Sequence, residues 1–232
     1  MFASKLHRVP VNVSVPLPPI EYMRLVCGDH PDLETYFVDF ATGCVRWFKE
    51  LGLLGPTVTV LDVGCGCGRM ARALLEERLK AYVGFDRHPG MIDWCQKEIS
   101  SQASHFQFRF FEIASTYAGM DGHRGSIEAS RFHFPFPPDT FDTCLVSSVF
   151  THMPIDEVAH YLEELHTVTR PGGRVFCSVF CAADETPFEE DHNFFLDRVA
   201  FLKAVEDHGF SWELKGAFKT GFGQNWYLLT KA

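Results

Sequence analysis

The chain has 232 residues, of which 46% are hydrophobic and 22% charged, a composition that fits one folded α/β domain and excludes a disordered protein. Its net charge of −9 argues against a nucleic-acid partner, because phosphate-binding surfaces are usually basic. The chain lacks an apolar stretch of the ~20 residues that cross a bilayer and an apolar signal-peptide core, so we expect a cytoplasmic protein with no membrane partner.

Helical spacing of apolar side chains predicts two helices near the start of the chain, over residues 21–27 and 33–51. The stretch before them, residues 9–20, is rich in Pro and Val and cannot be helical. We expect residues 1–52 to form an N-terminal extension to a domain that comprises residues 53–232.

Strand and helix patterns then alternate along the domain. Strands are predicted over residues 57–63, 81–86, 106–113, 141–147, 174–181, 212–219 and 225–230. Helices are predicted over residues 70–80, 90–100, 156–169 and 197–209. This alternation indicates a parallel sheet with helices on both faces, closed by an antiparallel pair of strands.

The most informative segment, residues 58–69, reads Val-Thr-Val-Leu-Asp-Val-Gly-Cys-Gly-Cys-Gly-Arg. An apolar strand enters a glycine turn, and a helical pattern follows, so backbone N–H groups at the helix N-terminus can meet a ligand. A Cβ atom at Gly64, Gly66 or Gly68 would hold that ligand away from the backbone. The segment predicts a site for a nucleoside-containing cofactor.

Two carboxylates narrow the choice of cofactor. Asp86 ends the second strand, eighteen positions after Gly68, where an acidic side chain accepts hydrogen bonds from both ribose hydroxyls. Sites for NAD and for S-adenosylmethionine share this arrangement. Asp62, however, ends the first strand beside the glycine loop, where its charge would repel a pyrophosphate but would suit the ammonium of a methionyl group. The charges favour S-adenosylmethionine.

Five segments, in the expected order and spacing, resemble motifs of the class I S-adenosylmethionine-dependent methyltransferases: residues 60–68, 83–86, 134–142, 147–153 and 170–175. The resemblance covers roughly residues 40–232. It departs from the family at Cys65 and Cys67 in the glycine loop, and at Glu112, where the family more often has Asp. The resemblance implies a Rossmann-like, doubly wound α/β sheet of seven strands, mostly parallel with an antiparallel last strand.

The resemblance also implies S-adenosyl-L-methionine as cofactor and S-adenosyl-L-homocysteine as product. The residues expected to bind the cofactor are Asp62, Gly64, Cys65, Gly66, Gly68, Asp86, Arg87, Met91, Glu112, Ile113, Ser147 and Ser148. Arg87 and Met91 would pack on the adenine faces, Glu112 would accept from the adenine amino group, and the Ile113 N–H would reach a ring nitrogen.

Catalysis of methyl transfer needs little from the protein, because a sulfonium is already a strong electrophile. Ser147 and Ser148 end the fourth strand near the sulfonium. An O–H or N–H acceptor must also lose a proton, and His152, at the mouth of the site, is the candidate general base. The alternative is that its imidazole caps a helix or orients the loop. His192 is a second candidate for the base.

No metal is expected. Cys65 and Cys67 stand in the glycine loop, where small buried side chains fill space, and the absence of any C-x-x-C pair agrees with reduced thiols. His160, Glu163, Glu164 and His166 share a helix whose buried face is supplied by leucines, so their side chains read as a solvated surface.

The resemblance implies that the N-terminal helices act as a lid, to which Tyr22, Arg24 and Tyr36 contribute. Phenylalanines in loops or at their edges are candidates to line an apolar acceptor pocket: Phe132, Phe134, Phe136, Phe150, Phe188, Phe194 and Phe195. We expect a small-molecule acceptor, methylated at O, N or C, since no further recognition domain is visible. The sequence is compatible with a monomer and with a homodimer.

Three other functions stay open. A nicotinamide oxidoreductase shares the strand–glycine–helix unit, but normally needs a catalytic Tyr-Lys pair or a substrate domain, and neither is evident. A protein of the same fold can direct S-adenosylmethionine to other chemistry, such as aminopropyl transfer. A non-catalytic protein can also retain the fold as a binding module, although intact glycines and Asp86 argue against a degenerate site.

Overall fold

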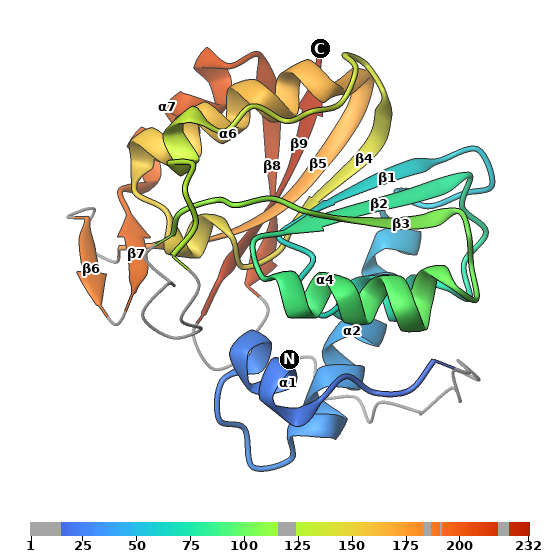
Figure 1. Ribbon diagram of the computed structural model, residues 1–232. Coiled ribbons are helices and arrows are strands. Elements are labelled where there is room, and N and C mark those ends of the chain that lie inside the picture. Colours follow the sequence, from blue (N-terminus) through green and yellow to red (C-terminus); the bar gives the residue numbers. More distant parts are fainter. Residues whose placement is uncertain (1–14, 116–123, 183–186, 191, 218–222) are drawn as a thin grey trace.

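The computed structural model describes residues 15–115, 124–182, 187–190, 192–217 and 223–232, and one sheet forms its centre (Figure 1). Seven of the nine strands of this sheet are β1 (Thr59–Val63), β2 (Ala81–Asp86), β3 (Phe106–Phe110), β4 (Phe141–Val146), β5 (Thr169–Cys181), β8 (Phe210–Ala217) and β9 (Asn225–Lys231). They lie in the order β3-β2-β1-β4-β5-β9-β8, and β9 is antiparallel to both of its neighbours. The Rossmann-like sheet with a reversed last strand is therefore confirmed.

The count of seven strands was wrong, because a short hairpin extends the sheet. Strands β6 (Phe188–Glu190) and β7 (Asn193–Leu196) pair with each other, and β7 also pairs with the end of β5. Stacked rings hold the hairpin in place, with centroid distances of 4.3 Å for Phe188–Phe195 and 4.9 Å for Phe180–Phe195. From the sequence, Phe188 and Phe195 are expected in loops or at their edges, because strands of three and four residues carry too little alternation to be recognised.

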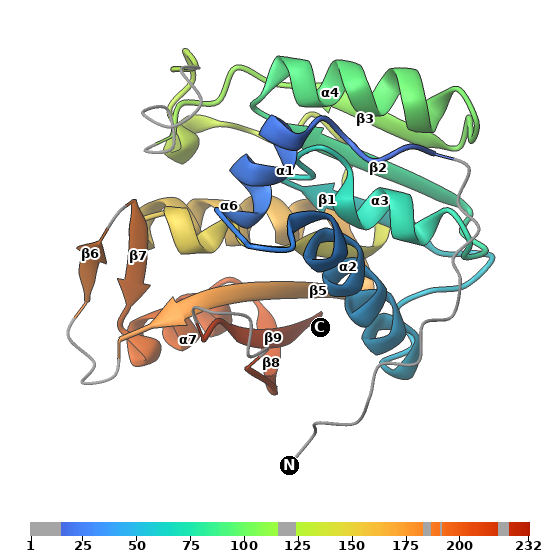
Figure 2. The same cartoon turned by 90° about the horizontal axis from the view of Figure 1, so that it is seen from below.

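Helices cover both faces of the sheet. They are α1 (Ile20–Cys27), α2 (Leu33–Glu50), α3 (Arg69–Leu74), α4 (Pro89–Cys95), α6 (Ile155–Val168) and α7 (Arg198–Asp207), with shorter turns η1 (Gln96–Ser100), η2 (Ala129–Arg131) and η3 (Phe150–His152). Helices α6 and α7 lie on one face, and α2, α3 and α4 on the other (Figures 1 and 2). The doubly wound arrangement follows from this distribution.

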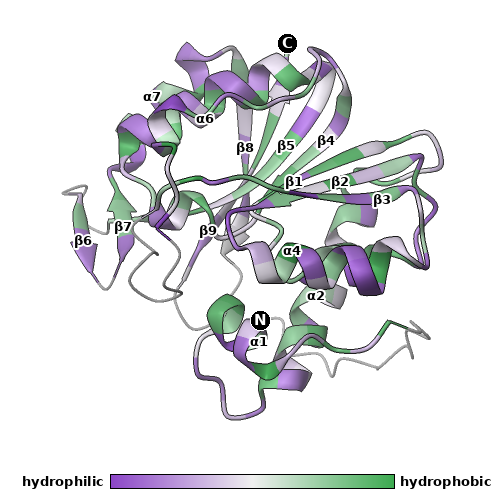
Figure 3. Cartoon of the chain, in the orientation of Figure 1, coloured by the Kyte–Doolittle hydropathy of each residue, from purple (hydrophilic) through white to green (hydrophobic). Residues whose placement is uncertain are grey.

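Alternation along the strands divides the core into two clusters. In β1, Leu61 packs into the cluster that includes the buried face of α6 and α7, whereas Val60 packs into the cluster that includes α2 and α3. In β4, Val146 and Leu145 divide in the same way. The central strands are accordingly hydrophobic along much of their length, as Figure 3 shows, because both of their faces are buried.

The boundaries of helices and strands depend on tertiary contacts as well as on hydrophobic periodicity. The helical pattern predicted over residues 70–80 ends at Leu74, because the chain must return to the sheet to begin β2. The Lys80 N–H donates to the Val58 carbonyl (2.9 Å), and Leu79 is buried. The predicted helix over residues 90–100 is present as α4 and its π-helical continuation η1.

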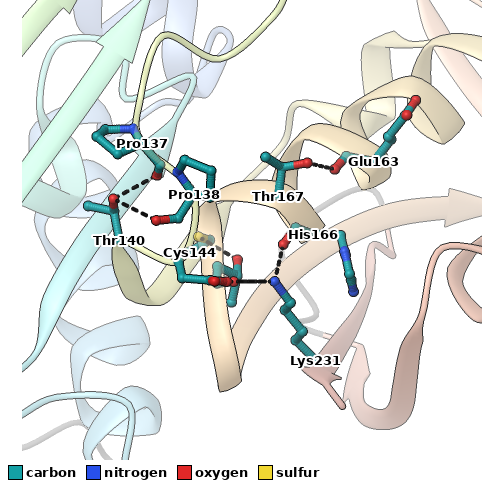
Figure 4. Close-up of polar contacts among 10 residues, drawn as sticks. Pro137, Pro138, Thr140, Cys144, Glu163, His166, Thr167 and Lys231 are labelled. Carbon is teal, nitrogen blue, oxygen red and sulfur yellow. Dashed lines mark hydrogen bonds and ion pairs between the residues drawn. The ribbon is translucent and has the colours of Figure 1, made fainter.

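A buried lysine anchors the last strand to the loop before β4 and to the junction between α6 and β5 (Figure 4). Lys231 Nζ donates to Asp139 Oδ1 (2.8 Å) and to the carbonyls of His166 (2.7 Å) and Thr169 (2.8 Å). Its side chain is 10% exposed, so these acceptors depend on the ammonium rather than on water. The end of β9 is thereby fixed to the segments that precede β4 and begin β5.

We expect Lys231→Ala to lower the free energy of unfolding by about 2 kcal/mol, because two backbone carbonyls lose their donor and Asp139 loses its partner. Urea denaturation followed by circular dichroism measures the change. Lys203→Ala is the control: its exposed ion pair with Asp207 (2.6 Å) is worth about 0.5 kcal/mol or less. Equal losses in the two variants would contradict the anchoring role of Lys231.

Candidate active site

A cavity opens at the carboxyl ends of β1, β2 and β4, where the order of parallel strands reverses between β1 and β4. Ten of the twelve residues expected to bind the cofactor line it: Asp62, Gly64, Cys65, Gly66, Asp86, Arg87, Met91, Ile113, Ser147 and Ser148. His152, the candidate base, lines it too. Gly68 and Glu112 are not part of its lining.

The glycine loop is folded tightly against its neighbours. The N–H groups of Gly64 and Cys65 both donate to the Phe85 carbonyl (2.9 and 3.0 Å) at the end of β2. Gly64 has φ +70°, and a Cβ atom there would lie 2.4 Å from Val149 Cγ2. This backbone conformation and this close approach both require glycine.

Gly68 has a packing role instead of lining the cavity. It precedes α3 with φ +72°, and a Cβ atom would lie 2.7 Å from Ile99 Cδ1 and 3.0 Å from Cys95 Sγ. The glycine therefore lets α3 begin close to the segment formed by α4 and η1. Cys65 and Cys67 are buried with raised thiol pKa values, caused chiefly by burial, which agrees with their expected space-filling role.

Asp86 is held by two backbone donors. Its Oδ2 accepts from the Gly66 N–H (2.8 Å) and its Oδ1 from the His88 N–H (2.9 Å). Burial raises the pKa of this carboxyl, while the two N–H groups and the nearby His88 and Arg87 oppose the shift. Each oxygen retains acceptor capacity, so the oriented carboxylate can bind a vicinal diol.

Asp62 is buried beneath the same loop and receives a 2.5 Å hydrogen bond from the Tyr82 hydroxyl. The pKa of Asp62 is raised to about 7, chiefly by burial and also by the carboxylate of Asp86, while the Tyr82 hydrogen bond and Arg69 oppose the shift. A cation bound in the cavity would favour the ionised form. Asp62 is thus suited to a ligand with an ammonium group.

The segment after β4 brings two serines to the cavity, and their hydroxyl groups differ in hydrogen bonding. Ser148 has φ +57°, its N–H donates to Ser178 Oγ (2.8 Å), and its hydroxyl contacts the Gln224 amide. A serine in this sparsely populated backbone region is held there by its surroundings. Ser147 Oγ is buried and has no hydrogen-bond partner among the described residues, so it is available to a ligand.

His152 is oriented by the β6–β7 turn. Its Nδ1 lies 2.9 Å from the carbonyl oxygen of His192; because a carbonyl can only accept, Nδ1 carries the proton and Nε2 the lone pair. Burial lowers the pKa of His152, the His192 hydrogen bond opposes this, and the His192 side chain adds to it. The His192 side chain is exposed and does not line the cavity.

The expected adenine contacts need two corrections. Glu112 is exposed, its Oε2 accepts from the Ser126 hydroxyl (2.7 Å), and it does not line the cavity. The Ile113 N–H donates to the Phe111 carbonyl (2.8 Å), although the Ile113 side chain lines the cavity. Arg87 Nε donates to the Ile113 carbonyl (3.1 Å), which joins the segments after β2 and β3.

Helix α1 covers the glycine loop with other side chains than those predicted. Leu25 and Val26 line the cavity, whereas Tyr22, Arg24 and Tyr36 do not. A Cβ atom on Gly66 would lie 3.1 Å from Val26 Cγ2, so helix and loop are in close contact. Arg24 forms an ion pair with Asp29 (3.7 Å), and Tyr36 stacks on His30 with ring centroids 4.4 Å apart.

Sequence reasoning missed the contribution of α6. Glu157 and Tyr161, four positions apart on this helix, both line the cavity, as does Met153 just before it. None of the seven phenylalanines proposed for an acceptor pocket does. Phe132, Phe134 and Phe150 are instead buried in the core. The i, i+4 spacing of an acid and an aromatic was the one available signal for α6, and it is common on solvated helices.

One cluster of potential metal ligands occurs among the described residues: His133, His160 and Glu164. Its members already bind protein groups. Glu164 accepts from the Phe134 N–H (2.6 Å) and lies 2.8 Å from His133 Nδ1, and His160 Nε2 lies 3.0 Å from the Phe132 carbonyl. The cluster is explained as an anchor for the loop before β4.

Comparisons with known proteins agree with this geometry. A family model described as a methyltransferase domain matches residues 61–177. A malonyl-[acyl-carrier protein] O-methyltransferase of Serratia marcescens is 30% identical over 132 residues, 57% of this chain and 42% of that protein. Cycloartenol-C-24-methyltransferase 1 of Oryza sativa subsp. japonica is 24% identical over 153 residues, 66% and 39% of the two chains. The chain spans about two-fifths of the length of these relatives.

Solved structures share the fold at low sequence identity. Magnesium protoporphyrin IX methyltransferase of Synechocystis PCC 6803 with bound S-adenosylmethionine has a TM-score of 0.63 and 17% identity, over 92% of this chain and 91% of that chain. The [4+2]-cyclase SpnF has a TM-score of 0.56 and 16% identity, over 82% and 80%. In the part of the chain that the structure describes, no helix has the length and apolar character needed to span a membrane.

We expect Gly64→Ala to weaken the binding of S-adenosylhomocysteine by about tenfold or more, because the new Cβ must displace Val149 from the cavity wall. Isothermal titration calorimetry measures the affinity. Gly172→Ala is the control, since Gly172 has a similar φ of +73° but nothing within 4 Å of an added Cβ. An unchanged affinity in Gly64→Ala would show that this close approach does not shape the site.

Proposed function

Because the chain belongs to the class I S-adenosylmethionine-dependent methyltransferases, we propose that it transfers a methyl group from S-adenosyl-L-methionine to an O, N or C atom of a small molecule. The observation that supports the proposal best is the shared cavity. Two oriented carboxylates, Asp62 and Asp86, and the candidate base His152 line one cavity at the carboxyl edge of the sheet.

The cofactor-binding residues have distinct tasks in this proposal. Asp86 is fixed by two N–H groups and would accept hydrogen bonds from the ribose hydroxyls. The backbone of Gly64 and Gly66 would lie against the methionyl part. Asp62 faces the ammonium, which holds it in the ionised form. Ser147 offers its unpaired hydroxyl beside the reacting centre. When bound, the cofactor supplies an electrophilic methyl group, so alignment and exclusion of water give much of the rate.

His152 removes the proton of an O–H or N–H acceptor. Its Nδ1–H donates to the His192 carbonyl, which places the basic lone pair on Nε2, and its lowered pKa keeps the imidazole neutral near pH 7. Helix α1, within the N-terminal extension, acts as a lid over the cofactor through Leu25 and Val26. The eight free thiols suit a reducing compartment, and a cytoplasmic location is part of the proposal.

A protein that binds S-adenosylmethionine without transferring its methyl group is the second candidate, because a cyclase shares the fold. Incubation with methyl-labelled S-adenosylmethionine and a panel of small phenols, amines and carboxylic acids separates the two. We expect labelled product and S-adenosylhomocysteine with at least one class of acceptor. Tight cofactor binding without turnover across the panel would favour the second candidate.

We expect His152→Ala to lower kcat by about 100-fold or more with an acceptor that must lose a proton, while the affinity for S-adenosylhomocysteine stays unchanged. In the wild type, the base is neutral above its lowered pKa, so kcat/KM should fall as the pH drops through a value below about 6.5. This acid limb should be absent from the residual activity of the variant. His105→Ala is the control, because His105 is exposed and distant from His152 in the sequence. Turnover within a few-fold of wild type in His152→Ala would refute the assignment.

A further inference from the structure

Helix α6 brings a carboxyl and a phenol into the cavity at positions that the cofactor assignments leave unused. Glu157 and Tyr161 are about one helical turn apart, and both line the cavity together with His152 and Met153. Asp62, Asp86 and the glycine loop are assigned to the cofactor. The α6 side chains are therefore placed to meet the second substrate.

Glu157 has an unusual electrostatic setting for a cavity residue. Within the described residues, no ion pair or hydrogen bond satisfies its carboxylate. The pKa of Glu157 is raised to about 7, chiefly by burial and to a smaller extent by the carboxylates of Asp156 and Glu128. Glu128 is also ion-paired with Arg131 (3.1 Å), so Asp156 is the acidic neighbour whose charge this pair does not offset.

Two arginines line the same cavity, and neither forms an ion pair with Glu157 among the described residues. Arg69 donates to Cys27 Sγ (3.4 Å), and its guanidinium lies 3.9 Å from the centroid of the Phe40 ring. Arg87 donates to the Ile113 carbonyl (3.1 Å). The lining also includes the imidazoles of His88 and His152. The α6 side of the cavity consequently has a carboxylate that lacks a countercharge.

The neighbours of Glu157 suit a ligand with an apolar body and a polar end. Val149, Met153 and Ala129 supply apolar lining. Tyr161 is buried, its ring packs edge-on against Phe134 at 5.2 Å, and its raised pKa, caused chiefly by burial and then by Glu157, keeps the hydroxyl protonated. The phenol can therefore donate or accept a hydrogen bond without adding charge.

We propose that Glu157 and Tyr161 form the acceptor subsite and select a small molecule that carries a protonated amine on an apolar skeleton. The inference rests on the proposed methyl transfer and names its substrate class. An ammonium group would supply the missing countercharge, whereas a carboxylate would be repelled by Glu157, which lines the cavity, unlike Asp156 and Glu128.

The test uses the wild-type protein saturated with S-adenosylhomocysteine and two probes of similar size, 2-phenylethylamine and 3-phenylpropionate. Calorimetric titration should show that the amine binds at least about tenfold more tightly than the acid. Glu157→Gln should weaken amine binding by about tenfold or more and leave the affinity for S-adenosylhomocysteine unchanged. The unchanged affinity for S-adenosylhomocysteine also shows that the variant is folded.

Asp156→Asn is the matched control, because it removes the same charge from the adjacent, exposed position that does not line the cavity. It should retain the preference for the amine. Equal binding of the two probes, or equal losses in the two variants, would overturn the inference while leaving the methyltransferase proposal intact. Failure of the wild type to bind S-adenosylhomocysteine would overturn both proposals.

Discussion

Four backbone N–H groups converge on the end of β2, and the candidate site depends on them. Those of Gly64 and Cys65 donate to the Phe85 carbonyl, and those of Gly66 and His88 donate to the Asp86 carboxylate. The glycine loop is thereby bound to the neighbouring strand before any ligand arrives. A loop held in this way presents its backbone without paying the entropy of ordering at the moment of binding.

Burial at this edge of the sheet explains why the carboxyl groups of the cavity have raised pKa values. Asp62, Asp86 and Glu157 come from β1, β2 and α6, elements that a switch point in strand order brings to one edge. Burial disfavours their charges, and each raised pKa records that cost. Such a cavity suits cationic ligands, which is consistent with a cofactor that bears an ammonium and a sulfonium.

Sequence patterns predicted the fold well where the signal for an element was local in the sequence. The alternation of strands and helices, the glycine turn and the reversed last strand are all local signals, and the structure confirms them. The β6–β7 hairpin was missed because it depends on stacking between Phe188, Phe195 and Phe180, which are neighbours only in space. Helix α3 ends early for a similar reason, since contacts with the sheet override its periodicity.

The residues of the candidate site show the same difference between local signals and contacts across loops. Residues at strand ends, such as Asp62, Asp86 and Ser147, could be placed from topology alone, because parallel strands end at one edge. The direction of a loop side chain such as Glu112 could not, since it depends on a hydrogen bond to Ser126 across a loop. Glu157 was not predicted as a site residue for a different reason, because a charged residue on a helix usually faces solvent.

The central claim is that this cavity holds S-adenosylmethionine through Asp86, and calorimetry with S-adenosylmethionine, S-adenosylhomocysteine and NAD tests it most directly. We expect the first two ligands to bind and NAD not to bind. Asp86→Ala should weaken that binding by about 100-fold, as expected for two lost hydrogen bonds to a charged group, whereas Asp93→Ala, an exposed carboxyl on α4, should not. NAD binding as tight as that of S-adenosylmethionine, or an unaffected Asp86→Ala variant, would contradict the claim.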